Sequence, residues 1–208
     1  MHLRAEALIL AVRSHGENHA IVRALTADHG VQAGYVRGGR SRRIRPILQP
    51  ANLVLGEWRA RTEDQLAGLT LELIHSRAPL YAEPLPAAAL EWVTVLAATA
   101  LPEGQPYPRL YAALAGVIGA IEAAPAARGW AVALARYELL VLAELGYGPE
   151  MDDLPAVLRT GGEAGWDDIL AALKVTGRGL EADILIDRRA ETLSGRARLV
   201  ERLKRAVA

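Results

Sequence analysis

The sequence predicts an α+β protein of two domains, a small closed β-barrel in residues 1–80 followed by an all-α domain in residues 81–208. Short apolar segments separated by Gly, Pro, Asn or Asp occupy residues 1–80, as is typical of strands joined by tight turns. No helix-length segment lies between them, which favours a closed barrel over a parallel sheet. After Pro79, apolar residues recur at the three- and four-residue spacing of helices.

The expected strands are short and show partial alternation of apolar and polar residues, which turns one face of each strand toward a core. They lie at residues 6–14, 20–28, 31–38, 51–61 and 66–76. The segment from Gly38 to Pro50, between the third and fourth strands, is long and polar. We expect it to project from the barrel as a loop.

The helical half begins with residues 86–101, which start at Pro86 and stop before Pro102. Residues 109–124 and 129–146 follow, and Gly146 is a typical helix stop. Shorter helices are expected at residues 166–175, 178–189 and 194–208. With 51% hydrophobic residues in a chain of 208, the protein has ample apolar content for a core.

The composition excludes several classes of protein. The chain has no cysteine, which excludes disulfides and thiolate metal sites and fits a reducing compartment. The first residues lack the basic region and cleavage site of a signal peptide, and the longest apolar stretches are too short to span a membrane. We therefore expect a soluble, cytoplasmic protein.

Charge is segregated along a chain whose formal net charge is zero. Residues 1–80 hold 11 Arg and 7 acidic residues, a net charge of +4, whereas residues 81–208 hold 13 basic and 17 acidic residues, a net charge of −4. Such asymmetry is typical of a nucleic-acid surface on one domain.

The strongest local signal is the segment YVRGGRSRRIRP at residues 35–46. Arginines this close repel one another, so we expect a negatively charged ligand against them. Arginine suits phosphate because its planar guanidinium donates two hydrogen bonds at once, and Gly38 with Gly39 allows the backbone to come close to the ligand.

A solvated turn is the alternative interpretation of this segment. Further arginines in the expected strands favour nucleic acid instead. The candidate nucleic-acid-binding residues are Arg37, Arg40, Arg42, Arg43 and Arg45 in the segment, with Arg13, Arg23, Arg59 and Arg61 in the strands. Tyr35 and Trp58 flank these basic residues and would either stack on bases or fill the barrel core.

His15, Glu17 and His19 alternate and would share one face of a strand, which is a weak indication of a hydrolytic metal site. Gly16 and Asn18 between them indicate a turn instead, where this alternation does not hold. No nucleophile stands out together with a histidine and a carboxylate. The sequence therefore favours a protein that is not an enzyme and needs no metal and no cofactor.

A second basic region lies near the end of the acidic half. We expect it to be the solvated face of an amphipathic last helix. A binding edge for an acidic protein tail or for DNA is the alternative. Its members are Arg188, Arg189, Arg196, Arg198, Arg202, Lys204 and Arg205.

Two further motifs follow one another along the chain. The first contains Gly16 and Glu17, a turn with Thr26, His29 and Gly30, the basic loop with its glycines, and Leu48, Gln49 and Pro50. The second is ARYELLVLAELGYGPEMD at residues 135–152, with Glu138, Leu139 and Leu140 ahead of Leu145, Gly146, Tyr147 and Gly148. In their order and spacing, the two motifs resemble the RecO family of DNA repair proteins. The resemblance covers most of residues 3–150 and, more loosely, the last helices.

The resemblance implies a five-stranded oligonucleotide-binding (OB-fold) β-barrel followed by a helical domain. It implies a cytoplasmic, nucleoid-associated protein that binds single- and double-stranded DNA and anneals complementary strands. With RecR, such a protein helps to load RecA onto DNA covered by single-stranded-DNA-binding protein. The arginines of residues 37–45 match the family's basic loop.

The resemblance also implies that the acidic, apolar C-terminal tail of the single-stranded-DNA-binding protein docks on the helical domain. Arg128 and Arg136 are the candidate contacts, because an acidic tail needs cations beside an apolar groove. Many members carry a cysteine-based zinc module after the second motif. Residues 149–168 contain no cysteine, so we expect no zinc.

Three other functions are compatible with parts of the sequence. An RNA-directed barrel would use surface aromatics, and the absence of Phe with few aromatics overall disfavours it. A protein adaptor would use the helical half and keep the arginines for solubility. A metal-dependent hydrolase would use His15, Glu17 and His19.

Overall fold

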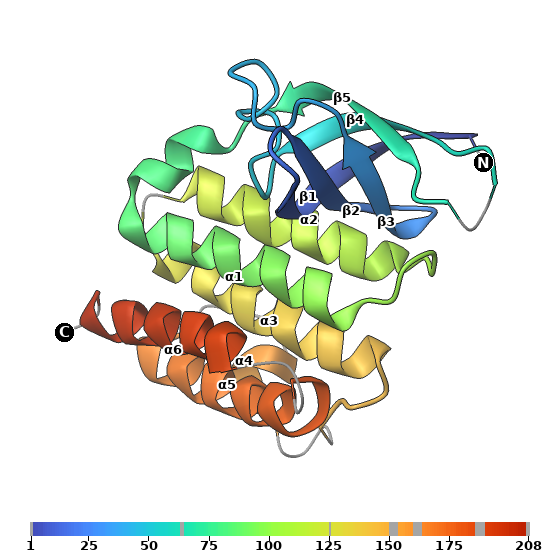
Figure 1. Cartoon of the computed structure of the whole chain (residues 1–208). Helices are drawn as coiled ribbons and strands as arrows, with labels where there is room; N and C mark the ends of the chain where they lie inside the picture. Colours follow the sequence, from blue (N-terminus) through green and yellow to red (C-terminus); the bar gives the residue numbers. More distant parts are fainter. Residues whose placement is uncertain are drawn as a thin grey trace. The chain divides into compact units, whose positions relative to one another are not determined.

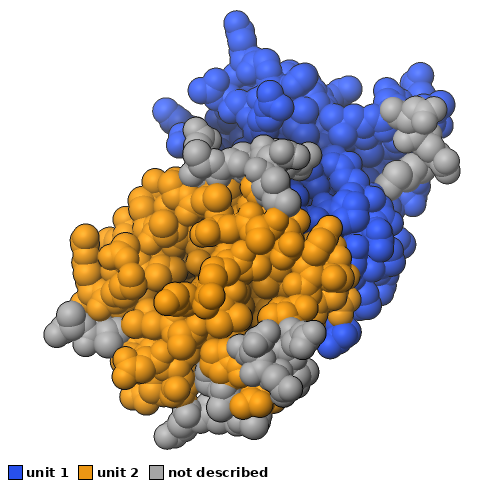
Figure 2. All heavy atoms as spheres, turned by 90° about the horizontal axis from the view of Figure 1, so that it is seen from below, with its two compact units in different colours: residues 1–83, 94–111 blue, residues 84–93, 112–208 orange. Residues whose placement is uncertain are grey.

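The computed structural model describes residues 2–62, 65–124, 126–149, 154–159, 164–185 and 190–206. The chain forms two compact units (Figure 2). The first comprises residues 1–83 and 94–111, and the second comprises residues 84–93 and 112–208. Residues 94–111 thus belong with the barrel, although the sequence groups them with the helices.

Five strands close into a barrel in the first unit (Figure 1). They are β1 (His2–His15), β2 (His19–Thr26), β3 (Gly30–Val36), β4 (Leu53–Arg59) and β5 (Gly68–His75). The order around the barrel is β1-β2-β3-β5-β4, and all neighbours are antiparallel except β3 and β5. This is the OB fold, so the fold class expected from the sequence is confirmed.

β1 is long enough to pair with β2 along one part and with β4 along the other, and this closes the barrel. Residues 2–8 pair with β4, and residues 7–15 pair with β2. The register shifts between Ile9 and Ala11, which is the mark of a bulge. A bulge bends a strand and increases its twist, and this lets one strand pass from one side of the barrel to the other.

The other regular elements among the described residues are helices. They are η1 (Ala78–Ala82, a 3-10 turn), α1 (Pro84–Ala100), α2 (Pro108–Ala123), α3 (Arg128–Glu144), α4 (Ala156–Arg159), α5 (Trp166–Gly179), η3 (Leu180–Ile184, a π turn) and α6 (Ala190–Arg205). One expectation is wrong: the separate helix expected at residues 178–189 does not form in its described part, because α5 continues into η3 with helical backbone at Leu180. Residues 186–189 lie outside the described residues. Among the described residues, no helix is both long and apolar enough to cross a membrane.

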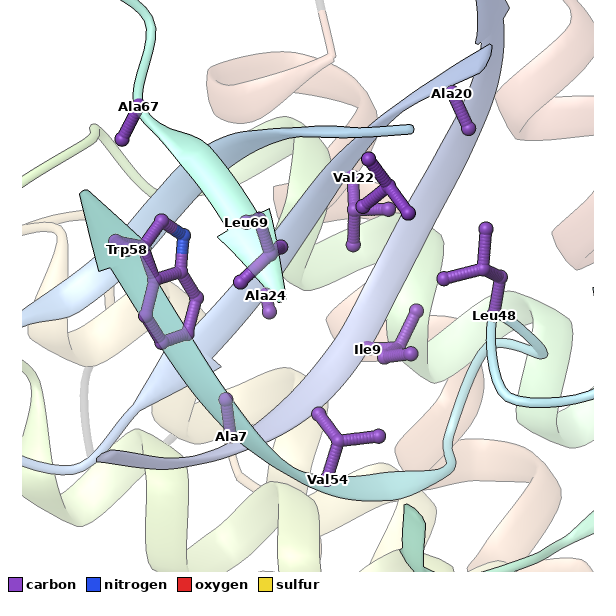
Figure 3. Close-up of a cluster of buried hydrophobic side chains, with 11 residues drawn as sticks. Ala7, Ile9, Ala20, Val22, Ala24, Leu48, Val54, Trp58, Ala67 and Leu69 are labelled. Atoms are coloured by element: carbon purple, nitrogen blue, oxygen red, sulfur yellow. The ribbon is translucent and has the colours of Figure 1, made fainter. Parts of the chain in front are cut away.

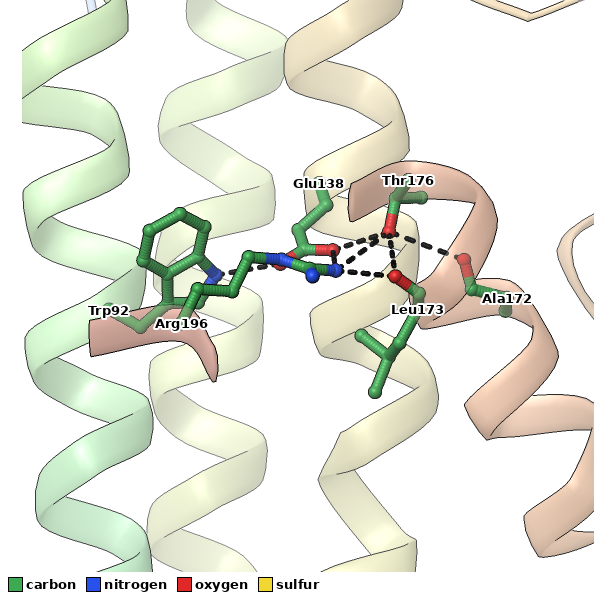
Figure 4. A network of polar contacts seen from close by, with 6 residues as sticks. All are labelled: Trp92, Glu138, Ala172, Leu173, Thr176 and Arg196. Atoms are coloured by element: carbon green, nitrogen blue, oxygen red, sulfur yellow. Dashed lines mark hydrogen bonds and ion pairs between the residues drawn. The ribbon is translucent and has the colours of Figure 1, made fainter. Parts of the chain in front are cut away.

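A buried ion pair joins the helices of the second unit (Figure 4). The carboxylate of Glu138 in α3 accepts hydrogen bonds from Arg196 of α6, at 2.8 Å from Nε and 2.7 Å from Nη2. Trp92 of α1 donates its Nε1–H to the same carboxylate at 2.7 Å, and the Thr176 hydroxyl of α5 donates to it as well. Burial by itself would lower the pKa of Arg196, but the Glu138 carboxylate raises it, so the guanidinium stays charged.

The position of Arg196 differs from the one expected for the C-terminal basic region. Arg196 is expected on a solvated face, yet it is only 8% exposed because Glu138 balances its charge inside the unit. Arg198, Arg202, Lys204 and Arg205 are exposed. Arg188 and Arg189 lie outside the described residues.

The barrel core consists of small side chains around one large ring (Figure 3). Trp58 of β4 is fully buried, so of its two interpretations the structure selects the core and excludes base stacking. The other buried members are Ala7, Ile9, Ala20, Val22, Ala24, Val36, Leu48, Val54, Ala67 and Leu69.

Two glycines make room for this ring. A Cβ atom at Gly56 would lie 2.4 Å from the Trp58 ring, and one at Gly34 of β3 would lie 2.6 Å from Cβ of Leu69 and 3.0 Å from Nε1 of Trp58. Gly34 therefore faces the core. Because successive residues of a strand face opposite sides, Tyr35 faces outward.

We predict that Gly34→Ala lowers the free energy of unfolding of the barrel by about 1–3 kcal/mol, because the added methyl group overlaps Leu69 and Trp58. Urea unfolding followed by tryptophan fluorescence measures this change. Gly116→Ala in α2 is the matched control, since nothing lies within 4 Å of a Cβ there. Because this space is free of the residues that the structure describes, the stability of this variant should be unchanged or higher by up to about 1 kcal/mol. A Gly34→Ala variant as stable as the wild type would contradict this description of the core.

Candidate nucleic-acid interface

Three strands of the barrel present a basic and aromatic outer face. Arg13 of β1, Ile21 of β2 and Tyr35 of β3 are in register across the antiparallel pairs, so their side chains share one side of the sheet. Arg13 is exposed and Tyr35 is half-buried. In OB folds this region, on the second and third strands, is the one that binds oligonucleotides.

Residues 37–50, here called the arginine loop, follow β3 and pack against the barrel. Leu48 is 4% exposed and belongs to the barrel core, and Ile44 and Ile47 pack against the same cluster. The segment thus forms a loop, as expected, and three apolar side chains within it hold its second half against the barrel. Its arginines stay on the solvent side.

Asn52 anchors the end of the arginine loop. Its side-chain nitrogen donates to the carbonyl oxygens of Pro46 at 3.0 Å and Ile47 at 3.1 Å. Its side-chain oxygen accepts the backbone N–H of Arg77 at 2.7 Å. Asn52 is fully buried, so these partners satisfy polar groups that would otherwise be costly to bury.

The two adjacent glycines shape the start of the arginine loop. Gly38 has a φ of 66°, in the left-handed region that favours glycine. A Cβ atom at Gly39 would lie 2.7 Å from Cβ of Ala20, so this glycine lets the backbone approach β2. The close approach is to the barrel itself, and the arginines that follow are thereby held at its edge.

All five arginines of the segment are exposed: Arg37, Arg40, Arg42, Arg43 and Arg45. Arg40 donates through Nη1 to the carbonyl oxygen of Glu17 at 3.3 Å, which ties the loop to the β1–β2 turn. Arg40 and Arg45 line a largely polar hollow of about 420 Å³ with Ser14 and Gln49. Two guanidinium groups and two hydrogen-bonding side chains thus line the same hollow, and such groups are suited to binding a phosphate.

The arginines expected in the strands differ from one another. Arg13 of β1 is exposed, and so is Arg61, which lies beyond the end of β4. Arg23 is partly buried, donates to the carbonyl oxygen of Leu101 at 3.3 Å and lies 3.6 Å from the Glu103 carboxylate. Because of these contacts, Arg23 is not part of the surface that the arginine loop forms.

Arg59 is exposed but carries its own counter-ion. Its Nη2 lies 2.6 Å from Oε1 of Glu57, and His2 lies 2.7 Å from the same oxygen. The hydrogen bond from Arg59, followed by the one from His2, lowers the pKa of the Glu57 carboxyl group. Glu57 therefore stays ionised and offsets the positive charge of Arg59.

The rings of His15 and His19 lie beside Tyr35. Their centroids are 5.7 Å and 5.2 Å, respectively, from the centroid of the Tyr35 ring. Within the described part of the chain, no group of three or more His, Cys, Asp or Glu residues is arranged to hold a metal ion. The two histidines thus make aromatic contacts with Tyr35.

In the second unit the two candidate tail contacts are differently placed. Arg136 of α3 lines an apolar groove of about 580 Å³ between α2 and α3. Arg128, at the start of α3, donates to the carbonyl oxygen of Ala164 at 3.1 Å from Nε and 3.0 Å from Nη2. Arg136 is therefore at the groove, whereas Arg128 is not among the residues that line it.

The sequence does not predict the residues that position the arginine loop. It gives no signal for Asn52, and it places Ile44, Ile47 and Leu48 in a segment that is polar on average. The available signal was the alternation of basic and apolar residues in RRIRPIL at residues 42–48. Such interleaving is typical of a segment with one face on a core and the other in solvent.

Two family models match the chain, "Recombination protein O N terminal" over residues 1–77 and "Recombination protein O C terminal" over residues 85–160. The DNA repair protein RecO of Gluconacetobacter diazotrophicus is 41% identical over 79% of this chain and 65% of its own length. The RecO of Phenylobacterium zucineum is 36% identical over 86% and 70%, respectively. That of Rhodospirillum centenum is 31% identical over 97% and 94%. The chain thus spans just under two thirds of the first of these relatives and nearly all of the third.

We predict that Asn52→Ala releases the arginine loop from the barrel. Loss of a buried donor costs roughly 1–3 kcal/mol, so limited trypsin cleavage within the loop should become about tenfold faster. Mass spectrometry should locate the new cuts after Arg40, Arg42 and Arg43. Asn18→Ala, at an exposed asparagine of the β1–β2 turn, is the control and should leave cleavage unchanged. Wild-type cleavage in a folded Asn52→Ala variant would show that Asn52 does not anchor the loop.

Proposed function

Because the chain belongs to the RecO family of DNA repair proteins, we propose that it takes part in DNA repair by binding single- and double-stranded DNA and annealing complementary strands. One observation carries this proposal. Five exposed arginines of residues 37–45 are held at the edge of an OB-fold barrel. That surface suits the phosphate backbone, which every DNA sequence shares.

Annealing requires that two negatively charged strands come together. Arginines that contact phosphates displace the condensed counter-ions and lower the repulsion between the strands. No covalent bond forms or breaks in this process, so the activity needs neither a catalytic group nor a nucleotide cofactor. We place this activity in the cytoplasm, at the nucleoid.

The partners we propose follow from family membership. With RecR, the protein would help to load RecA onto DNA covered by single-stranded-DNA-binding protein. The second unit offers a place for the acidic, apolar C-terminal tail of that binding protein. Ala113 and Gly116 of α2 have small side chains that leave room in the groove beside Leu140 of α3. Apolar residues of the tail would occupy this space, and its carboxylates would lie against Arg136.

We predict that changing Arg40, Arg42, Arg43 and Arg45 to Ala weakens DNA binding and annealing at least about tenfold at low salt. Each lost phosphate contact lowers the slope of log K against log salt by about 0.7 for single strands, so the slope should fall by roughly 2 to 3. Fluorescence anisotropy with labelled oligonucleotides at several salt concentrations measures both effects. Annealing of complementary labelled strands is followed in parallel.

The matched control removes four exposed arginines from the second unit, namely Arg159, Arg178, Arg198 and Arg205. This variant has the same net charge as the loop variant, so it separates a local DNA surface from overall charge. Binding lost in the loop variant alone supports the proposal. Binding lost equally in both variants, or only in the control, would contradict the assignment of the arginine loop.

We predict that Arg136→Ala weakens binding of a peptide with the acidic, apolar tail sequence about fivefold, since an exposed charge pair is worth roughly 1 kcal/mol. Leu140→Asp should abolish it by placing a carboxylate in the groove. Arg128→Ala is the control and should bind like the wild type. Calorimetric titration with the peptide measures the three affinities. A loss in Arg128→Ala that equals the loss in Arg136→Ala would place the tail elsewhere on the unit.

A further inference from the structure

We propose that Tyr35, flanked by His15 and His19, is a stacking site for an unpaired base of single-stranded DNA. This inference rests on the proposed function and extends it, because the arginines contact only the backbone that single and double strands share. A stacking site on the barrel would add a preference for unpaired bases. Stacking tolerates any sequence, because every base has an aromatic face.

The three rings form one cluster at the ends of three strands. The ring planes of His15 and Tyr35 meet edge to face at 83°, and those of His19 and Tyr35 are tilted by 35°. His19 is itself held in place, because the backbone N–H of Gly38 donates to its Nδ1 at 3.3 Å. The Tyr35 ring is therefore supported from β1 and β2 at a fixed position on the outer face.

The Tyr35 ring has a neighbouring position without a side chain. In the parallel pair of β3 with β5, Tyr35 is in register with Gly68, which is exposed. Among the described residues, a Cβ atom at Gly68 would meet only the carbonyl oxygen of Arg59, at 3.7 Å, so no described side chain covers this position of β5. A base can approach the half-buried ring from this direction. Trp58, by contrast, is closed off inside the barrel.

The charges around the ring fit a strand of DNA. Arg13 lies on the same outer face, opposite Ile21, which in turn is opposite Tyr35. Arg37 follows Tyr35 by two residues and is exposed. Cations near an aromatic ring are the arrangement in which phosphates bind while a base stacks on the ring. In a duplex the bases already stack on one another, so the ring would not serve double-stranded DNA.

The test compares Tyr35→Leu and Tyr35→Phe with the wild type on three ligands of one length. These are a thymidine oligonucleotide, an abasic oligonucleotide with the same number of phosphates, and a duplex. The wild type should bind thymidine more tightly than abasic DNA. Tyr35→Leu should lose this preference, with an affinity for thymidine that falls about 5- to 150-fold per stacked base. Its affinity for abasic DNA and for the duplex should not change, and its salt slope should equal that of the wild type.

Tyr35→Phe keeps the aromatic ring and should retain the preference for thymidine. His15→Ala should lose part of the preference for thymidine over abasic DNA. Because His15 is exposed, this variant tests the ring cluster even if Tyr35→Leu does not fold. If the wild type binds thymidine and abasic DNA equally, or Tyr35→Leu loses both equally, the stacking site is overturned and the arginine surface stands. If the wild type binds none of the three ligands, the proposed function itself fails.

Discussion

The packing of Trp58 inside the barrel constrains the rest of the first unit. The ring fits only because Gly34 and Gly56 have no side chain where it lies. Strand residues alternate between the two sides of a sheet, so an inward Gly34 fixes an outward Tyr35. The register of β3 with β2 and β1 then sets which residues share that outer face. The packing of the core thus determines which side chains lie on the outer face of the barrel.

The arginine loop is fixed by the same core. Leu48 enters the cluster around Trp58, and Gly39 lets the backbone approach Ala20. Neighbouring guanidinium groups repel one another, and a free loop would relieve that repulsion by spreading. Apolar anchoring prevents this and keeps the charge concentrated at the barrel edge. Two other arginines of the first unit have carboxylates that offset their charge, Glu57 for Arg59 and Glu103 for Arg23.

The second unit has its own constraint in the Glu138–Arg196 pair. A charge inside a protein is tolerated only with a matched partner and satisfied hydrogen bonds, and the carboxylate of Glu138 also serves Trp92 and Thr176. Residues from α1, α3, α5 and α6 therefore meet at one site. This geometry keeps α3 in place within the unit, and α3 carries the Arg136 side of the apolar groove.

The strands, most helices, the segregation of charge and the two family motifs can be predicted from the amino-acid sequence, because periodicity, turn residues and charge are local properties. The burial of individual side chains cannot be predicted in this way. Trp58 and Tyr35 were equivalent in sequence, and only the closed barrel placed one inside and the other outside. Arg196 and Arg198 belonged to one basic run, yet Arg196 pairs with Glu138, 58 positions away in the chain. Such pairing depends on tertiary packing, and this is why the tertiary structure alone decided which arginines remain available to a ligand.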